Sequence, residues 1–330
     1  MQKGLLAVIF LLVFHFGHTA DKKEISSPNG KIKVVAETKE KLYYSIFYEN
    51  KILLLPSAIN MILTDGTELS GKIVFKKTTT RYNNSVIVSP VPEKRKNIPD
   101  IYNELTIRFK QSLSIIFRVY NDGVAYRFVS HFKDSIVIKN ETASFNFPAT
   151  HLFYYPEVVK RENTDIYHTS FEEPYKLKPL DSLTQTNLCF TPVLVAPTEG
   201  PKIIITESDL EDYPGMFVNG NSNTSLTGQF APYPLEEKVA EGEFPQAIVT
   251  KRADYIAKTK GNRSFPWRVL LIAATDTELP ANDMVYRLAS PSRINDVSWI
   301  NPGKGTDEWI IGINLFNVSF KTGVNTATYK

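Results

Sequence analysis

Short runs in which polar and apolar residues alternate dominate the chain between residues 25 and 148. The segments 32–36 and 105–109 follow a period of two, which is the repeat of a strand with one buried face. Turn sequences separate such runs, as in ENK at 49–51 and NDG at 121–123. No sustained apolar stripe at helical spacing occurs in this region. The pattern predicts an all-β domain of the sandwich type.

The alternation stops between Pro148 and Pro179, where aromatic and carboxylate side chains are concentrated. We expect a long ordered loop here, and long loops in compact domains are often functional. Strands are expected again at 190–195 and 202–206. A last strand is predicted at 296–300, and one turn of helix near the end of the chain. A single strand and a helical turn cannot bury a core. This tail therefore either packs on the sandwich or is the edge of a larger protein.

Residues 1–20 have the pattern of a secretory signal peptide. Lys3 precedes an apolar core at 5–16, and the small residue Ala20 precedes a strongly polar stretch. An uncleaved anchor is the alternative, but the apolar core is short for a bilayer span. No later stretch predicts a membrane span. We expect cleavage after Ala20 and a secreted or periplasmic protein.

Charge and cysteine content indicate which partners to expect and how the domain is stabilised. The 330 residues are 42% hydrophobic and 22% charged, with a net charge of +3, and the basic residues are interleaved with acidic ones. This balance argues against a nucleic-acid partner. Cys189 is the sole cysteine and stands between Leu188 and Phe190. We expect a buried, inert thiol in a domain that depends on a large core rather than on disulfides.

Several segments, taken in order along the chain, resemble glycoside hydrolase family 97. They extend from SPNG at 27–30 to the C-terminal region and are densest in NDGVAYR at 121–127, ESDLEDYPGM at 207–216, RADYI at 252–256, FPWR at 265–268 and WINPGK at 299–304. Members of that family are exported, calcium-dependent α-glucosidases and retaining α-galactosidases. They combine an N-terminal β-sandwich, a central (β/α)8 barrel that carries the catalytic carboxylates, and a small C-terminal β domain.

The resemblance implies three parts of the present chain. Residues 1–20 are the signal peptide, and residues 21–290 are a large supersandwich of antiparallel strands. Residues 291–330 are the linker and the first strand and helix stub of an incomplete, truncated barrel. Glycoside hydrolysis needs two carboxyl groups that flank the scissile bond. Barrel enzymes carry such groups on several strands, so no catalytic residue is expected in this chain.

One metal ligand follows from the resemblance. The family has a Tyr-Glu-x-x-Tyr-like segment whose glutamate reaches the active site and helps to bind calcium. The present chain has SFEEPY at 170–175, which places Glu172 at that position and replaces the usual tyrosine by Phe171. Calcium takes about six to eight oxygen ligands. Glu172 is therefore either a weak residual ligand in this chain alone or a surface carboxylate without a role.

The resemblance also places Trp299, Lys304 and Trp309 at the sugar-binding side of the first barrel strand. Tryptophan rings can stack on the C–H face of a sugar. The sequence departs from the family beyond Lys304, because Asp307 and Ile310 stand where tryptophans are usual. Ordinary apolar packing of Trp299 and Trp309 is the alternative, and the more common one.

A group of charged residues and a turn sequence are two further features of the chain. Arg252, Asp254, Arg263 and Arg268 resemble a charged network near the domain junction, and we expect paired structural charges there. The YPGM sequence at 213–216 predicts a shaped loop near the sugar-binding cleft.

Three functional hypotheses stay open. In the first, the chain is the carbohydrate-associated N-terminal domain of an exported α-glycosidase and is inactive alone. In the second, it is part of an active calcium-dependent α-glycoside hydrolase whose barrel lies on another chain or was lost. In the third, it is a stand-alone periplasmic module that binds oligosaccharides without calcium. An oligosaccharide or α-glycoside is the expected partner in each.

Overall fold

The computed structural model describes residues 21–71, 73–91, 94–162, 165–221, 223–241, 245–304, 318–321 and 326. The expected signal peptide lies outside these residues. The chain divides into two units, residues 1–86 with 99–290 and residues 87–98 with 291–330. Each unit is described by itself.

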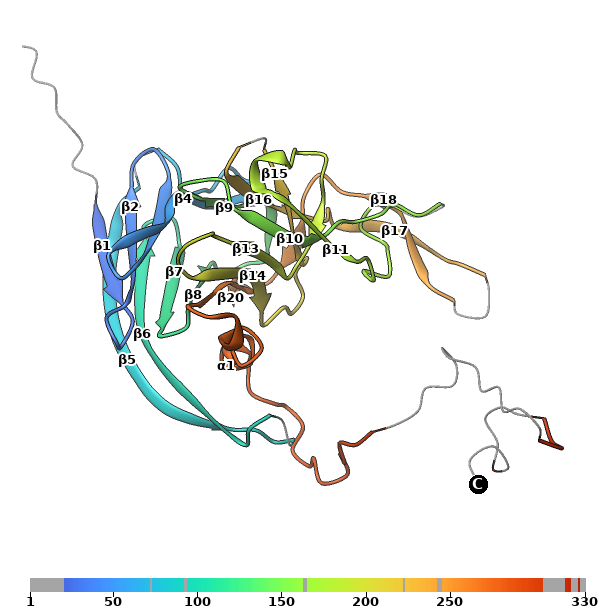
Figure 1. The fold of residues 1–330 in the computed structure, drawn as a ribbon. Coiled ribbons are helices and arrows are strands. Elements are labelled where there is room, and N and C mark those ends of the chain that lie inside the picture. The colour runs from blue at the N-terminus through green and yellow to red at the C-terminus, as the bar shows by residue number, and fades with distance from the viewer. Residues whose placement is uncertain are drawn as a thin grey trace, which may run out of the picture. The chain divides into compact units, whose positions relative to one another are not determined.

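The first unit is built from two large antiparallel sheets (Figure 1). One sheet has the order β1 (Lys22–Ser26), β2 (Ile32–Thr38), β3 (Leu42–Tyr48), β4 (Lys51–Leu63), β9 (Ile136–Asn146), β16 (Ser225–Phe230), β15 (Met216–Gly220) and β12 (Cys189–Phe190), with β19 (Ala257–Thr259) paired to β9. We call it the first sheet.

The second sheet has the order β11 (Tyr175–Pro179), β10 (Leu152–Pro156), β13 (Val193–Ala196), β14 (Lys202–Ser208), β21 (Trp267–Ala273), β8 (Gly123–His131), β7 (Leu113–Tyr120), β6 (Asn97–Phe109) and β5 (Phe75–Val88), with β20 (Asn262–Ser264) paired to β8. A separate hairpin consists of β17 (Pro234–Val239) and β18 (Ala247–Arg252). The helical elements are short: η1 (Leu180–Ser182), η2 (Asp276–Glu278) and α1 (Met284–Leu288). The prediction of an all-β fold with antiparallel strands is confirmed.

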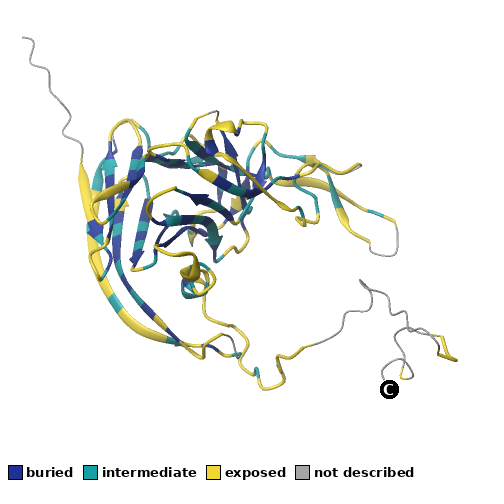
Figure 2. Ribbon diagram, viewed as in Figure 1, coloured by how far each residue is buried: buried dark blue, intermediate teal, exposed yellow. Residues whose placement is uncertain are grey.

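Alternating side chains build the core between the sheets, as Figure 2 shows by the buried residues on both. Leu105 and Ile107 of β6 are buried, and they lie opposite Phe117 and Ile115 of β7. The intervening Thr106 and Arg108 point to the other face. The period-two pattern of the sequence thus corresponds to the inward face of the second sheet.

A buried charge cluster crosses the core between the sheets. Arg268 on β21 donates two hydrogen bonds of 2.8 Å to the carboxylate of Glu141 on β9 and one of 2.5 Å to Glu207 on β14. Arg268 is 1% exposed and Glu141 is 2% exposed. Burial raises the pKa of the Glu207 carboxyl, and the adjacent guanidinium offsets this only in part. Burial opposes the charge on Arg268, but the carboxylates outweigh it and raise the pKa of the guanidinium.

Turn chemistry explains several connections. Glu49 and Asn50 both have positive φ, at 47° and 65°, and they join β3 to β4 where Tyr48 pairs with Lys51. Two left-handed residues are what a two-residue hairpin turn of the primed type needs. The turn expected at 49–51 is confirmed.

The single long loop expected from Pro148 to Pro179 is wrong at both ends. Residues 152–156 and 175–179 form β10 and β11, which pair with each other from Leu152 opposite Pro179 to Pro156 opposite Tyr175. The aromatic residues of β10 are strand formers, and Phe153 and Tyr155 are fully buried in the core. The connecting loop is therefore limited to residues 157–174.

The second unit contains the segment where the start of the barrel was expected, and the strand predicted at 296–300 is not formed. This segment is a turn, in which the amide of Ile300 donates to the carbonyl of Val297 at 3.0 Å. The Asp296 side chain also accepts a hydrogen bond from the Ser298 amide at 3.0 Å. Local bonds of this kind compete with strand pairing when no neighbouring strand is present. In the described part of the chain no helix is long and apolar enough to cross a bilayer.

Candidate functional site

The loop that carries Glu172 connects β10 to β11, and we call its described residues, 157–162 and 165–174, the Glu172 loop. Its first residue is fixed by polar contacts. Glu157 accepts hydrogen bonds from Lys176 at 2.5 Å and from Asn187 at 2.7 Å. Burial opposes ionisation, but these two donors hold the pKa of Glu157 below its usual value. An isolated antiparallel β-bridge between Glu157 and Cys189 also fixes this end of the loop.

A second anchor lies at the middle of the loop. Asp165 accepts a hydrogen bond of 2.6 Å from Arg252 at the end of β18, and its other oxygen accepts the Tyr167 amide at 2.8 Å. Burial raises the cost of the charge, yet the arginine keeps the pKa of Asp165 below its usual value. The Arg252 guanidinium also lies 5.2 Å from the centre of the Tyr167 ring. Residues far apart in the sequence thus hold the loop against the β17–β18 hairpin.

Aromatic contacts make the third anchor, directly before Glu172. The Phe171 ring lies 5.3 Å from the Phe190 ring and 5.8 Å from the Phe217 ring, and Tyr167 packs on Phe217 at 5.3 Å. Phe171 has a φ of 56°, which is unusual for a bulky residue. Such a backbone persists only where surrounding contacts determine it. The two ring contacts therefore fix the direction in which the chain enters Glu172.

Glu172 itself is exposed, and the structure records no hydrogen bond or ion pair for its carboxylate in the described part of the chain. Within the same residues, no group of three or more His, Cys, Asp or Glu side chains is arranged to hold a metal. One carboxylate supplies a minority of the oxygens that calcium needs. Glu172 is thus an isolated, exposed carboxylate among the described residues, and its role in binding calcium stays a prediction.

The three predicted sugar-binding residues belong to the second unit. Trp299 is 69% exposed, and its indole N–H donates to the carbonyl of Asp296 at 3.1 Å. Trp299 is thus exposed among the described residues, and the choice between sugar binding and apolar packing stays open. Lys304 is exposed as well. Trp309 lies outside the described residues, and a role of these residues in sugar binding stays a prediction.

The charged residues near 252–268 do not form one network. Arg252 binds Asp165, and Arg268 binds the buried Glu141 and Glu207. Arg263 makes separate contacts, which include 2.7 Å to the Glu211 carbonyl and 3.4 Å to the Asp212 carboxylate. The sequence places these arginines close together, but they lie on three different strands, β18, β20 and β21, and each has its own partners. Asp254 is exposed on the surface.

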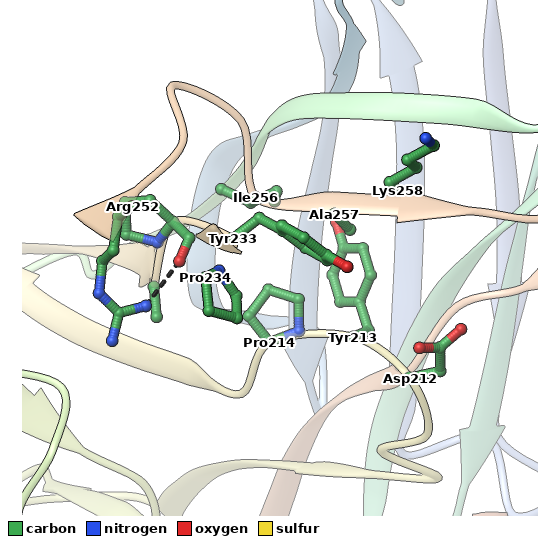
Figure 3. A pocket seen from close by; sticks show the side chains of 11 residues that line it. Asp212, Tyr213, Pro214, Tyr233, Pro234, Arg252, Ile256, Ala257 and Lys258 are labelled. Atoms are coloured by element: carbon green, nitrogen blue, oxygen red, sulfur yellow. Dashed lines mark hydrogen bonds between the residues drawn. The ribbon is translucent and has the colours of Figure 1, made fainter. Parts of the chain in front are cut away.

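The buried cysteine is found as expected, whereas a position of the YPGM sequence near the sugar-binding cleft stays a prediction. Cys189 is buried, and burial raises the pKa of its thiol to about 12. Tyr213 and Pro214 line a pocket of about 290 Å³, which also includes Tyr233, Arg252 and Lys258 (Figure 3). The sequence indicated a shaped loop at Tyr213 but gave no sign of this pocket or that residues 231–234 form one wall of it. Their proximity depends on the β17–β18 hairpin, which the alternation pattern did not reveal.

Two large antiparallel sheets over one hydrophobic core define the first unit as a β-sandwich domain. The sequence model described as "Glycosyl-hydrolase 97 N-terminal" matches residues 25–291. The chain belongs to glycoside hydrolase family 97, and the matched part is the N-terminal domain of that family.

Two curated relatives carry enzyme names. A retaining alpha-galactosidase of Bacteroides thetaiotaomicron is 36% identical over 310 residues, which are 93% of this chain and 47% of the relative. A probable retaining alpha-galactosidase of Streptomyces bingchenggensis is 25% identical over 294 residues, 87% of this chain and 40% of the relative. The chain thus spans about half the length of these proteins or less.

Solved structures show the same fold. A family 97 enzyme from Pseudoalteromonas sp. strain K8, solved with acarbose and also with panose, matches with a TM-score of 0.70 at 23% identity and covers 85% of this chain and 40% of that one. A beta-arabinopyranosidase matches with a TM-score of 0.63 at 22% identity over 76% of this chain and 40% of that one. At these identities, the structural similarity shows only that the β-sandwich has the same fold.

Proposed function

We propose that this chain supplies the carbohydrate-associated N-terminal domain of an exported, retaining α-galactosidase. The observation that carries the proposal is the 36% identity to the Bacteroides enzyme across 93% of the chain. Both curated relatives are named for α-galactosides, which favours this substrate over an α-glucoside. The acarbose and panose complexes of a more distant member keep an α-glucoside as the second candidate.

Catalysis is proposed to need residues beyond this domain. The matched residues 25–291 correspond to the N-terminal domain alone, whereas barrel glycosidases carry their carboxylate pair at the ends of barrel strands. We therefore expect no turnover by the chain alone. Activity of the whole enzyme would require the barrel in the same or in another chain.

Glu172 is proposed to reach the active site of that enzyme and to provide one carboxylate to a calcium ion. The anchors of the Glu172 loop support this role, because they order an exposed carboxylate that has no partner of its own in the described structure. When bound, calcium would supply an electrostatic centre for the sugar. The chain's own contribution is to hold the Glu172 loop in place.

Hydrolysis assays test the proposal. Purified residues 21–330 are incubated with aryl α-galactoside and aryl α-glucoside, with calcium and with chelator, alone and together with the barrel domain of a family member. We expect turnover only in the mixture, faster on the α-galactoside, and reduced by chelator or by Glu172→Gln. Calcium-dependent turnover by the chain alone, or a mixture that is indifferent to Glu172→Gln, would contradict the proposal.

Export is a separate part of the proposal. The pattern of residues 1–20 supports a signal peptide with cleavage after Ala20. N-terminal sequencing of the protein recovered from the periplasm or medium is expected to begin at Asp21. Recovery of the full-length chain from the membrane fraction would favour the uncleaved anchor instead.

A further inference from the structure

The pocket of about 290 Å³ in Figure 3 lies on the first unit and does not include Glu172. Its volume is close to the lower end of small-molecule sites, roughly 300–1,000 Å³. The lining comes from three segments that are distant in sequence, at 212–214, 231–234 and 252–258. None of the residues that the family resemblance assigned to calcium or to sugar is among them.

The floor of the pocket is built into the core. Tyr213 is buried, and its ring packs edge-on against Phe265 at 5.2 Å and against Phe230 at 6.3 Å. The neighbouring Ile256 and Ala257 are buried too, and the Ile256 amide donates to the carbonyl of Ile138 on β9 at 2.9 Å. The floor is thus preformed, so that a ligand would not have to order it.

The wall opposite the floor is aromatic and partly open to solvent. Tyr233 stacks on Tyr255, with ring centres 5.5 Å apart, and is 37% exposed. Backbone hydrogen bonds tie it to the 253–255 segment, from the Tyr233 amide to the Tyr255 carbonyl at 2.8 Å and from the Ala253 amide to the Tyr233 carbonyl at 2.9 Å. In Figure 3 its ring extends across the pocket next to Pro234 and Tyr213. Because the backbone of Tyr233 is hydrogen-bonded and its ring stacks on Tyr255, the ring loses little conformational entropy when a ligand covers it.

The rim carries charges of both signs. Lys258 is exposed, and among the described residues its side-chain ammonium has no recorded hydrogen bond or ion pair. The Asp212 carboxylate is largely exposed and lies 3.4 Å from Arg263. Arg252 is committed through Nε to Asp165 and through Nη1 to the carbonyl of Pro232. The rim therefore offers both donors and an acceptor to a neutral partner.

We propose that this pocket binds one pyranose unit of a neutral oligosaccharide. A sugar ring combines an apolar C–H face, which suits Tyr233 and the proline walls, with hydroxyl groups that both donate and accept hydrogen bonds. A fully apolar ligand would leave the charged rim without partners, and an anion would meet the Asp212 carboxylate. The choice of an α-galactoside as the sugar rests on the proposed function, while the pocket itself does not depend on Glu172 or calcium.

Calorimetric titration of residues 21–330 with melibiose, in the presence of chelator, tests the proposal. The variants are Tyr233→Ala and Lys258→Met, and the matched control is Tyr82→Ala, which removes an exposed tyrosine from β5. We expect the dissociation constant to rise about fivefold or more in Tyr233→Ala, which loses an aromatic contact. A rise of about threefold is expected in Lys258→Met, which loses a charged donor at the rim. The control should bind as the wild type does. Unchanged circular dichroism verifies that each variant is folded.

Each result bears on the proposal. The proposal would be overturned if the wild-type chain bound neither melibiose nor maltose, or if the pocket variants bound as tightly as the wild type. Maltose in place of melibiose tests the second candidate sugar, and binding of maltose with the same dependence on Tyr233 would support the pocket while changing the substrate class. Tighter binding of melibionate, the acidic analogue, would show an anion site instead. Loss of the Glu172-dependent turnover described above would leave these binding results intact, so the two proposals can fail separately.

Discussion

The cluster of Arg268, Glu141 and Glu207 allows a quantitative test of what holds the sandwich together. Replacement of Arg268 by methionine keeps an extended apolar side chain but leaves two buried carboxylates without their cation. Removing one member of a buried ion pair typically costs about 3–5 kcal/mol. For a domain of this size, with about 2 °C per kcal/mol, the expected fall in melting temperature is about 6–10 °C.

The pH dependence separates charge from packing. In the wild type, burial raises the pKa of Glu207 above its ordinary value of 4.5. The stability that this group contributes is therefore present below the unfolded pKa and is lost as the pH rises through the folded pKa. Without Arg268, the Glu207 carboxyl keeps the burial penalty and loses the attraction of the guanidinium, so its pKa rises further. The amount by which Arg268→Met lowers the free energy of unfolding should therefore shrink as the pH is lowered from about 7 to about 4.5.

Urea unfolding of residues 21–330 at both pH values, followed by the fluorescence of the buried Trp267, measures this loss of stability. Arg268→Lys should be intermediate, because it keeps a charge but not the paired geometry of the guanidinium. Lys251→Met, which removes an exposed ion pair of 3.1 Å to Glu236, is the matched control and should change little. A loss below about 1 kcal/mol at pH 7 would refute the reasoning that two buried carboxylates are costly without their cation. An equal loss in the free energy of unfolding at both pH values would refute the argument that charged, unpaired carboxylates cause the loss.

Three other predictions concern single residues. The Cys189 thiol should resist alkylation in the folded protein at pH 8, because burial raises its pKa to about 12, and rapid stoichiometric labelling without denaturant would contradict this. Gly261→Ala should destabilise the sandwich by about 2 kcal/mol or more, since a Cβ there would lie 1.9 Å from the carbonyl oxygen of Asp134, whereas Gly303→Ala meets nothing within 4 Å and should be neutral by the same thermal unfolding assay. Phe171→Ala should speed hydrogen exchange of the amides at 165–175 about tenfold by removing the aromatic anchor, and unchanged exchange would show that Asp165 and Glu157 suffice.

The sandwich could be predicted from the sequence because its signals are local. The period-two alternation at 105–109 and the ENK turn at 49–51 each depend on neighbouring residues, and both correspond to the structure. The prediction of a loop misses β10 and β11. The LFYYP sequence of β10 is apolar throughout and shows no alternation, and the YKLKP sequence of β11 alternates but is a single short, fully exposed strand. The segment 296–300 was assigned as a strand because of its apolar residues, but a strand requires a partner, which the described part of the chain does not provide.

The site was predictable only in part, for a physical reason. Glu172 was identified by resemblance of the SFEEPY segment, but its anchors are long-range. Asp165 binds Arg252, 87 residues away, and Phe171 packs on Phe217. The wall of the pocket at Tyr233 likewise depends on the pairing of β17 with β18. No local pattern encodes such contacts, which arise when the two sheets close over the core.

The anchors also bear on how a single exposed glutamate can serve a metal site. Ordering a backbone residue costs about 1–2 kcal/mol, and a mobile loop would have to meet that cost for each residue when the ion binds. Here the ring contacts of Phe171 and the ion pair of Asp165 order the Glu172 loop in the described structure. Calcium affinity would then depend on the charge and number of the ligands rather than on the folding of the loop. In the proposed calcium role, the anchors would preorganise Glu172, and loss of Phe171 should weaken a calcium effect even though Phe171 has no oxygen ligand to offer.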